Sequence, residues 1–213
     1  MTLDVIIFGA GGHAQVVADI LFRMYETDGS VRPIGYLDDD QTLWGRRFLD
    51  LPVMGSTLDL KNIPHHAVVI AIGNNRIRKR FAYSLTQMGE QFVTASHPTA
   101  IIAPDVTIKP GTMICAGVII NTGSMIGGHV ILNTGSAIDH HNFIHSYSHI
   151  APGVHLGGQV IVEDGAFVGL GASVIPRVNI GAWSMVGSGA VVISDIPAGV
   201  TAVGVPAKPL RRS

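Results

Sequence analysis

Residues 102–126 read IAPDVT-IKPGTM-ICAGVI-INTGSM-I, with Ile at the start of every block of six. The pattern continues without exception to Val192, so that sixteen successive blocks begin with Ile, Leu or Val. The fifth residue of nearly every block is small or β-branched, which suits a tight turn. Neither the helical period of about 3.6 nor the strand period of about 2 explains this repeat. A solenoid of short strands does, because each block then forms one flat side whose aliphatic side chain points inward.

The composition limits the classes of function. At 213 residues the chain is long enough for two modest domains, each with its own core. A net charge of -1 and a charged fraction of 14% indicate no basic face for nucleic acid. No apolar run approaches the roughly 18 residues that a membrane span requires, so we expect no membrane partner. The hydrophobic fraction of 47% and the mean hydropathy of +0.39 fit a chain that buries surface between subunits.

The single cysteine, Cys115, excludes an intramolecular disulfide and suits the cytoplasm. The opening stretch, MTLDVIIFGAGGH, contains neither a basic n-region nor a cleavage site, so we expect a cytoplasmic protein. Cys115 directly follows a repeat aliphatic, and we interpret it as a small turn residue rather than as a nucleophile.

The N-terminal part of the chain alternates strands and helices. Three apolar segments predict strands that end in glycine or acidic turns: residues 4–8, 33–37 and 67–72. Helical patterns follow the first and third of them, over residues 15–25 and 76–87. Alternation of this kind predicts a small parallel sheet that binds its ligand where the carboxyl ends of the strands meet. Three motifs fall on that edge: Gly9–Ala14, Asp38–Asp40 and Gly73–Asn75.

Gly9-x-Gly11-x-x-Ala14 nearly matches the dinucleotide-binding fingerprint, and Asp38 stands about where a ribose-binding acid is expected. Glycines let the backbone approach a phosphate, and the helix N-terminus favours its negative charge. A full dinucleotide fold needs two mononucleotide halves, whereas little more than one half precedes the repeat. We therefore favour a nucleotide diphosphate, such as the carrier of an activated sugar, over NAD. The alternative is that the glycines only form a tight turn.

The repeat resembles that of the hexapeptide-repeat acyltransferases, in which a left-handed parallel β-helix turns once per three blocks. Sixteen blocks then make about five coils, each rising by about 4.8 Å. Such a solenoid serves as an acyltransferase, as a γ-type carbonic anhydrase or as an assembly scaffold, so the site residues must decide. We place the boundary at Ser96-His97-Pro98, where the alternation stops and the period of six begins.

The combination resembles the sialic acid O-acetyltransferase and bacillosamine-type nucleotide-sugar N-acetyltransferase family. The matching pieces are GAGGHAQVV, YLDDD, AIGNNRIRKR, SHPTAIIAP, the histidine-rich segment and the terminal GVPAK. The resemblance implies a Rossmann-like α/β half domain over residues 1–96 that holds the nucleotide sugar. It implies an all-β left-handed β-helix over residues 97–213 that carries the acetyl-CoA site and the trimer contacts. The implied nucleotide-sugar pocket is lined by Gly11, Gly12, His13, Asp38, Asp39 and Gly73. For His13 an equal alternative is a water-exposed position in the first helical turn.

Five of the ten histidines lie between residues 140 and 155. The resemblance places the catalytic base at His140, where a near-neutral imidazole can take the proton of an attacking amine. It places His149 against acetyl-CoA. Gly158 lies one coil of eighteen residues after His140, where its N–H is placed to stabilise the thioester oxyanion. The resemblance places the pantetheine chain along the corners of later coils, at Gly169, Leu170, Gly187, Ser188 and Gly189. An equal alternative is that the glycines there only form turns.

The chain departs from the family directly after the base. Relatives usually have Glu or Asp there, and that carboxylate orients the imidazole, whereas this chain has His141. A histidine exchanges one hydrogen bond but brings no negative charge. Three explanations stay open: Asp139 takes over the role, a neighbouring subunit does, or the base works with a lower pKa. His141 is also an alternative base, although the motif phase favours His140.

A metal site is an alternative reading of the same segment. His140, His145 and His149 have spacings like those of zinc ligands in β-helix carbonic anhydrases. They fall at different phases of the six-residue period, and such a lyase has no use for a nucleotide-binding domain, so we expect no metal. We interpret His145 and His155 as exposed at turns.

The tail and the site together give the expected function. The resemblance implies CoA phosphate contacts for Lys208, while Arg211 and Arg212 are better explained as a solvated basic terminus. We expect a trimeric N-acetyltransferase with acetyl-CoA as co-substrate and direct transfer, because no cysteine or serine nucleophile stands beside His140. By resemblance the acceptor is the 4-amino group of a UDP-linked 4-amino-4,6-dideoxy sugar for bacterial surface glycan or glycoprotein synthesis. GDP- or dTDP-linked sugars, a sialic acid hydroxyl and a zinc lyase stay open as alternatives.

Overall fold

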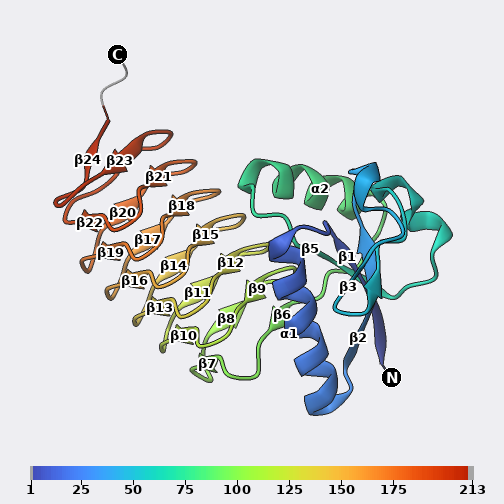
Figure 1. Cartoon of the computed structure of the whole chain (residues 1–213). Coiled ribbons are helices and arrows are strands. Elements are labelled where there is room, and N and C mark those ends of the chain that lie inside the picture. Colours follow the sequence, from blue (N-terminus) through green and yellow to red (C-terminus); the bar gives the residue numbers. More distant parts are fainter. Residues whose placement is uncertain (1, 211–213) are drawn as a thin grey trace. The chain divides into compact units, whose positions relative to one another are not determined.

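The chain, which this computed structural model describes over residues 2–210, changes its architecture between Pro98 and Thr99. The unit before this point alternates strands and helices, and the unit after it is a stack of short strands (Figure 1). Each unit is compact by itself.

Strand β1 (Leu3–Phe8) is the centre of the sheet in the first unit, with β2 (Val31–Leu37) on one side and β5 (Ala67–Ile70) on the other. All three strands are parallel, and Phe8 pairs with both Leu37 and Ile70. The carboxyl ends of the strands therefore coincide, as the alternation predicts. The turns that carry the three predicted motifs start from this common edge.

Helix α1 (Gly12–Asp28) packs on β1 and β2, and α2 (Asn75–Gln87) packs against β5. The first helix begins three residues before the predicted start, and it ends at Gly29, whose φ of +68° is the left-handed conformation that glycine favours. Asn74 caps α2 by accepting hydrogen bonds from two N–H groups of the first turn. The remaining elements of this unit are short: η1 (Gln41–Leu43), β3 (Arg47–Phe48), β4 (Leu51–Pro52), η2 (Thr57–Asn62) and β6 (Ala95–Ser96).

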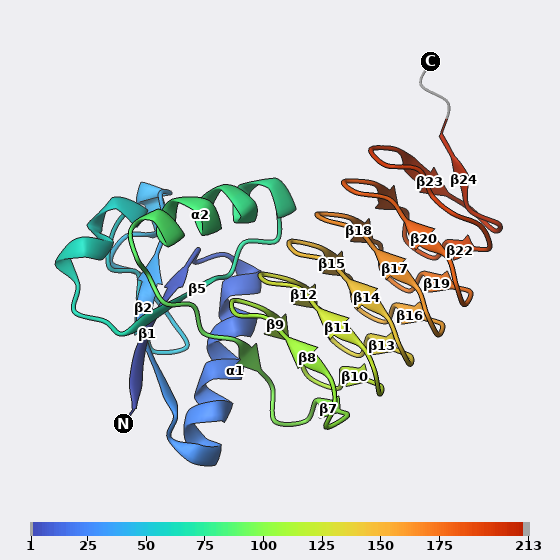
Figure 2. The same cartoon turned by 180° about the vertical axis from the view of Figure 1, so that it is seen from behind.

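The second unit is a solenoid with three faces, and each face is a sheet of parallel strands (Figures 1 and 2). One face, here called face D, contains β7 (Ile101–Ile102), β10 (Ile119–Ile120), β13 (Ala137–Ile138), β16 (His155–Leu156), β19 (Ser173–Val174) and β22 (Val191–Val192). Face E contains β8 (Thr107–Ile108), β11 (Met125–Ile126), β14 (Phe143–Ile144), β17 (Ile161–Val162) and β20 (Asn179–Ile180). Face C contains β9 (Met113–Ile114), β12 (Ile131–Leu132), β15 (His149–Ile150), β18 (Phe167–Val168), β21 (Met185–Val186), β23 (Thr201–Val203) and the antiparallel β24 (Lys208–Pro209).

The repeat aliphatic is the second residue of each of these strands and points into the solenoid. From Ile114 to Val192 every one of these side chains is at most 4% exposed, while Ile102 and Ile108 are half-buried. The period of six therefore gives the core, and the predicted fold class is confirmed. The parallel pairing of β23 with β21 continues the solenoid beyond the last predicted repeat.

The corners of the solenoid have a second period of six. Every sixth residue from Gly111 to Gly189 has a positive φ, a conformation that suits glycine best. Six of these corner residues are not glycine: His129, His141, Tyr147, Gln159, Arg177 and Trp183. Because the chain returns to the same edge after three blocks, residues eighteen apart lie in one column.

Polar side chains under the corners bind successive coils together. Thr112, Ser124, Asn142 and Ser148 each donate a hydrogen bond to the carbonyl fifteen residues further along. All four are buried. The small residues that the sequence shows at this phase thus contribute hydrogen bonds as well as fitting under the turn. Among residues 2–210, no helix has the length and apolar character to cross a membrane.

Candidate active site

The glycine turn after β1 leaves open space in front of α1. Gly11 is the N-cap of α1, and no side chain caps this helix. A Cβ added to Gly11 or Gly12 would meet no atom within 4 Å, and both residues are exposed. Gly9 is needed for the tight turn itself, because its φ is +99° and an added Cβ would lie 3.2 Å from the Ala71 carbonyl. The start of α1 is therefore accessible to an anion.

The acidic residues after β2 hold the turns of this edge together. The Asp38 carboxylate accepts hydrogen bonds from the N–H groups of Ala10 (2.7 Å) and Asp40 (2.9 Å). Asp39 accepts hydrogen bonds from the N–H and the hydroxyl of Thr57, at 2.9 and 2.8 Å. Asp38 thus fixes the glycine turn, a positioning role that the sequence analysis did not foresee.

Arg78, which the sequence analysis missed, is fully buried beneath the third turn. Its guanidinium donates hydrogen bonds to the carbonyls of Ile72 (2.8 Å) and Gly73 (3.3 Å) and to the side chain of Asn75. Burial lowers the pKa of Arg78 to about 9, so the group is charged at neutral pH. Gly73 itself is exposed, with no atom within 4 Å of an added Cβ. A buried cation therefore supports an open glycine turn.

A signal for Arg78 exists in the sequence. Arg78 shares the buried face of α2 with Ala82 and Leu85, at helical spacing, whereas Lys79 and Arg80 beside it are exposed. Within the run RIRKR, only the helical spacing to Ala82 and Leu85 distinguishes the buried arginine from its exposed neighbours.

His13 is the second residue of α1, and its predicted alternative as a water-exposed residue is wrong. The residue is half-buried, and its Nε2 has no contact with solvent. Burial, with the positive charge of Arg78 as the second cause, lowers the pKa of the imidazole to about 4. His13 is therefore neutral at physiological pH.

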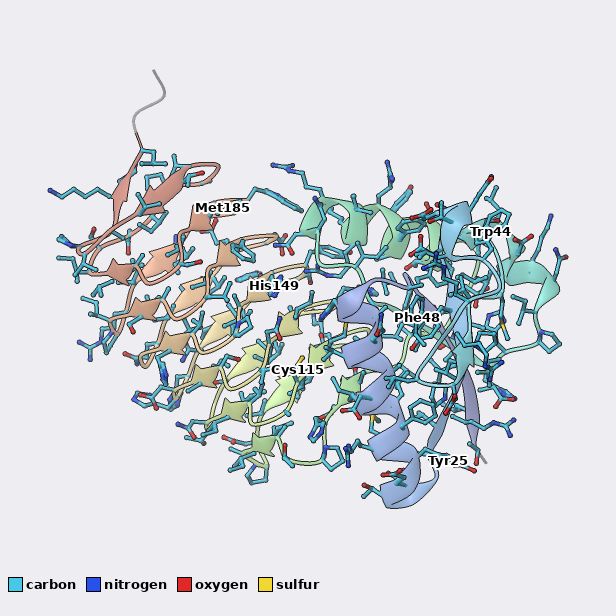
Figure 3. The ribbon with its side chains drawn as sticks, viewed as in Figure 1. Tyr25, Trp44, Phe48, Cys115, His149 and Met185 are labelled. Atoms are coloured by element: carbon cyan, nitrogen blue, oxygen red, sulfur yellow. The ribbon has the colours of Figure 1, made fainter. Side chains whose placement is uncertain are left out.

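Trp44 is a second residue of this edge that the sequence analysis did not single out. Its indole Nε1 donates a 2.8 Å hydrogen bond to the Asp38 carbonyl, and the residue is 42% exposed (Figure 3). A flat aromatic surface is thus fixed beside the turn after β2, where a nucleotide base can stack.

In the solenoid, His140 lies at the corner between β13 and β14, with its ring over Gly158 of the next coil. A Cβ on Gly158 would lie 2.5 Å from Nε2 and 3.0 Å from Nδ1 of His140. Half of the His140 side chain is exposed. Within residues 2–210 the Gly158 N–H donates no hydrogen bond. A solvent-accessible imidazole and a free backbone N–H therefore lie side by side, as a general base and an oxyanion donor require.

The buried Asn142 fixes this corner, and the sequence analysis did not identify it. Its Nδ2 donates to the carbonyls of Asp139 (2.7 Å) and Gly157 (3.0 Å), and its Oδ1 accepts from the Val160 N–H (3.1 Å). A signal for Asn142 exists in the sequence, because it is an Asn at the fifth position of a block, where the other blocks have small or β-branched residues. Asn142 thus holds the backbone on which His140 is mounted.

Asp139 is one of the predicted partners of His140, and its contact with the ring is long. Asp139 Oδ2 lies 3.9 Å from His140 Nε2, while Oδ1 accepts a hydrogen bond from Asn121. Hydrogen bonds from the His140 backbone and from Asn121 lower the pKa of this carboxyl. Asp139 therefore contributes charge near His140 without a hydrogen bond to its ring.

His141 contacts His140 directly. Their Nδ1 atoms are 3.2 Å apart, and the two rings meet edge to face with centroids 5.3 Å apart. His141 adopts a φ of +57°, so it is one of the strained corner residues. The nearest hydrogen-bonding group to the ring of His140 is thus another histidine.

Apart from Gly158, the predicted acetyl-CoA residues lie elsewhere on the solenoid. His149 is half-buried on face C, where Asn133 Nδ2 lies 3.2 Å from its Nε2 and its ring packs edge to face on Phe167 (Figure 3). His140 and Gly158 lie on the edge between faces D and E. The residues predicted to hold the pantetheine chain lie on the edge between faces C and D, and they are Gly169, Leu170, Gly187, Ser188 and Gly189. One chain therefore does not bring the two groups together.

Steric crowding within the chain explains why two of these positions are glycine. A Cβ on Gly169 would lie 2.7 Å from the Ser188 N, and one on Gly187 would lie 2.7 Å from Val203 Cγ1. Leu170 and Ser188 are exposed between them. Lys208 is exposed on β24, and the predictions for Arg211 and Arg212 lie outside the described residues.

The structure agrees with the plain interpretation of Cys115 and corrects that of His155. Cys115 is fully buried, and burial raises the pKa of its thiol to about 11, which does not suit a nucleophile. Across residues 2–210, no three His, Cys, Asp or Glu side chains gather as a metal site. His145 is exposed after β14. His155 is exposed as well, but it lies on strand β16 rather than at the predicted turn, because its phase points outward from face D.

Comparison with known proteins decides the family. Residues 4–85 match the PglD N-terminal domain family. The chain is 33% identical to the GDP-perosamine N-acetyltransferase of Escherichia coli O157:H7, over 97% of this chain and 96% of the relative. The chain belongs to the nucleotide-sugar N-acetyltransferase family.

Members of this family give further similarities. PerB from Caulobacter crescentus, solved in complex with CoA and GDP-perosamine, is 38% identical, with a TM-score of 0.90 over 97% of both chains. The UDP-N-acetylbacillosamine N-acetyltransferase of Bacillus subtilis is 41% identical over 52% of this chain and 50% of that relative. The predicted family, the predicted acetyltransferase activity and acetyl-CoA as co-substrate are thereby confirmed. This protein is a nucleotide-amino-sugar N-acetyltransferase.

Proposed function

We propose that this N-acetyltransferase modifies the 4-amino group of a nucleotide-linked 4-amino-4,6-dideoxy sugar, with His140 as the general base. The position of the His140 ring over Gly158 carries the proposal, because it joins a proton acceptor to a free N–H donor at one corner. Base catalysis of this kind contributes about 10²–10⁴-fold.

The chemistry requires only groups that this corner supplies. His140 accepts a proton from the attacking amine as the new C–N bond forms, and the Gly158 N–H stabilises the charge on the thioester oxygen. The C–S bond then breaks, and protonated His140 returns the proton to the thiolate of CoA. Cys115 is buried and its raised thiol pKa keeps it protonated, which supports direct transfer over an acyl-enzyme.

We propose that the α/β unit binds the nucleotide sugar and that the active enzyme is a trimer. The open starts of the turns at Gly11, Gly12 and Gly73, above the buried charge of Arg78, suit a diphosphate. The two groups of predicted solenoid residues lie on different edges of one chain, and an acetyl-CoA molecule in position for transfer must contact both. A neighbouring copy that brings its C–D edge beside the D–E edge completes such a site.

For the nucleotide, we propose GDP ahead of the UDP that the sequence resemblance implies. The relatives that are similar over nearly the whole chain include a GDP-perosamine enzyme and a complex with GDP-perosamine. The UDP-sugar relative matches only about half of the chain. UDP is therefore the second candidate.

The test is a thiol-release assay with acetyl-CoA and a panel of GDP-, UDP- and dTDP-linked 4-amino-4,6-dideoxy sugars, including GDP-perosamine. We expect rapid CoA release with the GDP-linked sugar and a loss of about 10²–10⁴-fold in kcat for His140→Ala. His155→Ala, an exposed histidine on face D, is the matched control. Release with only the UDP-linked sugar overturns the choice of nucleotide. If no sugar of the panel gives CoA release, the proposed class of acceptor is wrong, and sialic acid hydroxyls are assayed next.

A further inference from the structure

His141 presents each of its two ring nitrogens to a different neighbour. Nδ1 faces His140, at 3.2 Å from that residue's Nδ1. The opposite edge of the ring lies over Gly123 of the preceding coil, since a Cβ on Gly123 would lie 2.6 Å from Cδ2 and 2.8 Å from Nε2 of His141. The ring therefore bridges the base and the corner one coil earlier.

A carboxylate is fixed at that earlier corner. Asp105 Oδ2 accepts hydrogen bonds from the Thr122 hydroxyl (2.7 Å) and from the Gly123 N–H (3.0 Å). Asp105, Gly123 and His141 occupy one column at steps of eighteen residues. The bond from Thr122 is the main cause that lowers the pKa of Asp105, and the charge of His141 is a further one. Because Asp105 is bound to Gly123, and Gly123 lies against the Cδ2–Nε2 edge of His141, the carboxylate is on the Nε2 side of that ring.

Only one proton arrangement satisfies both contacts while leaving the base free. If His140 donates its Nδ1–H to Nδ1 of His141, then His140 Nε2 is unprotonated above Gly158 and can accept a proton. His141 then carries its own proton on Nε2, on the side of Asp105. A nearby anion favours this tautomer and any positive charge that develops on the pair.

We propose that His141 is a positioning residue that couples the general base to Asp105, so that the three residues His140, His141 and Asp105 replace the acid that relatives have directly after the base. This inference rests on the proposed role of His140. The missing carboxylate is thus supplied by the same chain, from two coils before His141, through an imidazole.

The other charged groups around this corner do not take this role. Asp139 is 3.9 Å from His140 Nε2, on the reacting edge of the ring, and its Oδ1 is bound by Asn121. Arg177 belongs to the same column two coils beyond His141, and its Nε donates a 2.9 Å hydrogen bond to Gln159, which lies between them. Among the acids of this corner, Asp105 is the one on the His141 side.

The first test is the pH profile of kcat/KM in Asp105→Asn. Loss of the charge disfavours the protonated pair, so the acid limb moves to lower pH, by about 0.5, and kcat falls about tenfold with KM for the sugar unchanged. Asp195→Asn is the matched control, because Asp195 is another exposed carboxylate that accepts a backbone N–H, that of Asn179, at the far end of the solenoid from His141. Equal profiles for both variants overturn the proposal.

A second set of variants separates charge from folding. Thr122→Val removes one hydrogen bond of Asp105 but keeps the carboxylate, so we expect the acid limb to stay in place. His141→Asp puts a carboxylate directly beside the base, and Asp105→Asn added to it should change kcat less than twofold. If Asp105→Asn is as harmful in His141→Asp as in the wild type, Asp105 acts through the fold alone and the proposal fails.

A readout without turnover keeps the two proposals distinguishable. NMR titration of the full-length protein with ¹³C-labelled histidine should show His140 and His141 titrating as a coupled pair, and both midpoints should move down in Asp105→Asn. Independent titration, or midpoints that Asp105→Asn does not change, overturns the coupling even if the sugar is acetylated. Coupled titration with a silent substrate panel leaves the coupling in place and overturns the proposed function.

Discussion

The imidazole of His140 occupies the space that a side chain on Gly158 would fill, with Nε2 only 2.5 Å from the position of such a Cβ. The two residues are one coil apart, so the glycine both admits the ring and leaves its N–H free. The proposed base and the proposed oxyanion donor are therefore positioned by the same close approach.

Gly158→Ala should displace His140 and leave the fold intact, because the ring is half exposed and can rotate into solvent. We expect kcat to fall about 10²–10⁴-fold and the unfolding temperature to change little. Gly128→Ala is the control at the same repeat phase on another edge, where the nearest atom to the added Cβ is 3.2 Å away. Normal turnover in Gly158→Ala would show that His140 does not need this position.

Asn142→Ala should destabilise the solenoid by at least about 2 kcal/mol, because it leaves the Gly157 carbonyl and the Val160 N–H without partners and removes one of the two hydrogen bonds to the Asp139 carbonyl. Asn142→Ser should recover part of the loss, since Ser124 and Ser148 make the corresponding bond at their own corners. Urea unfolding measures both. If Ala and Ser are equally destabilising, the hydrogen bonds are not the cause.

Stability of the α/β unit should fall in acid because of His13. Its folded pKa of about 4 lies below the ordinary 6.5, so the unfolded chain binds a proton that the folded chain excludes. The cost is absent above pH 6.5, grows as the pH falls towards 4 and approaches roughly 3 kcal/mol. His13→Gln should remove this dependence in urea unfolding at pH 7.5, 6 and 5. The same loss in both proteins contradicts the assignment to His13.

Trp44→Ala should raise KM for the nucleotide sugar about tenfold with kcat nearly unchanged, because the exposed indole offers a stacking surface remote from the reacting amine. Trp44→Phe keeps a flat ring but loses the bond to the Asp38 carbonyl, so an intermediate KM is expected. Initial-rate kinetics at saturating acetyl-CoA check both. An unchanged KM in Trp44→Ala would exclude stacking.

The fold was predictable because its signals are periodic. The aliphatic at every sixth residue fixes the strands and the core from Ile114 to Val192, and the apolar segments of the first unit fix the parallel sheet. Continuation into β23 was missed, because Thr201–Val203 falls out of phase with the repeat. The start of α1 was missed because Gly12 is a poor helix former that packing of Ala14 and Val17 nonetheless carries into the helix.

The site was only partly predictable, because its supporting contacts join residues that are distant in sequence. The motif around His140 indicated a candidate base, but nothing local indicates that Asp105 lies beside Gly123 or that Arg78 is buried under Gly73. The state of His13 depends on burial and on Arg78, which a motif does not record. Such contacts follow from the three-dimensional register alone.

The return of the chain to the same edge after eighteen residues limits which insertions and deletions this enzyme can accept. Positions 105, 123, 141, 159 and 177 form one column, so an insertion of a single residue in any coil would shift every later member out of line. Insertion or loss of a whole coil would keep each column in register and change only its length. Substitutions that compensate one another should therefore be sought at separations of eighteen, well beyond the reach of a local motif.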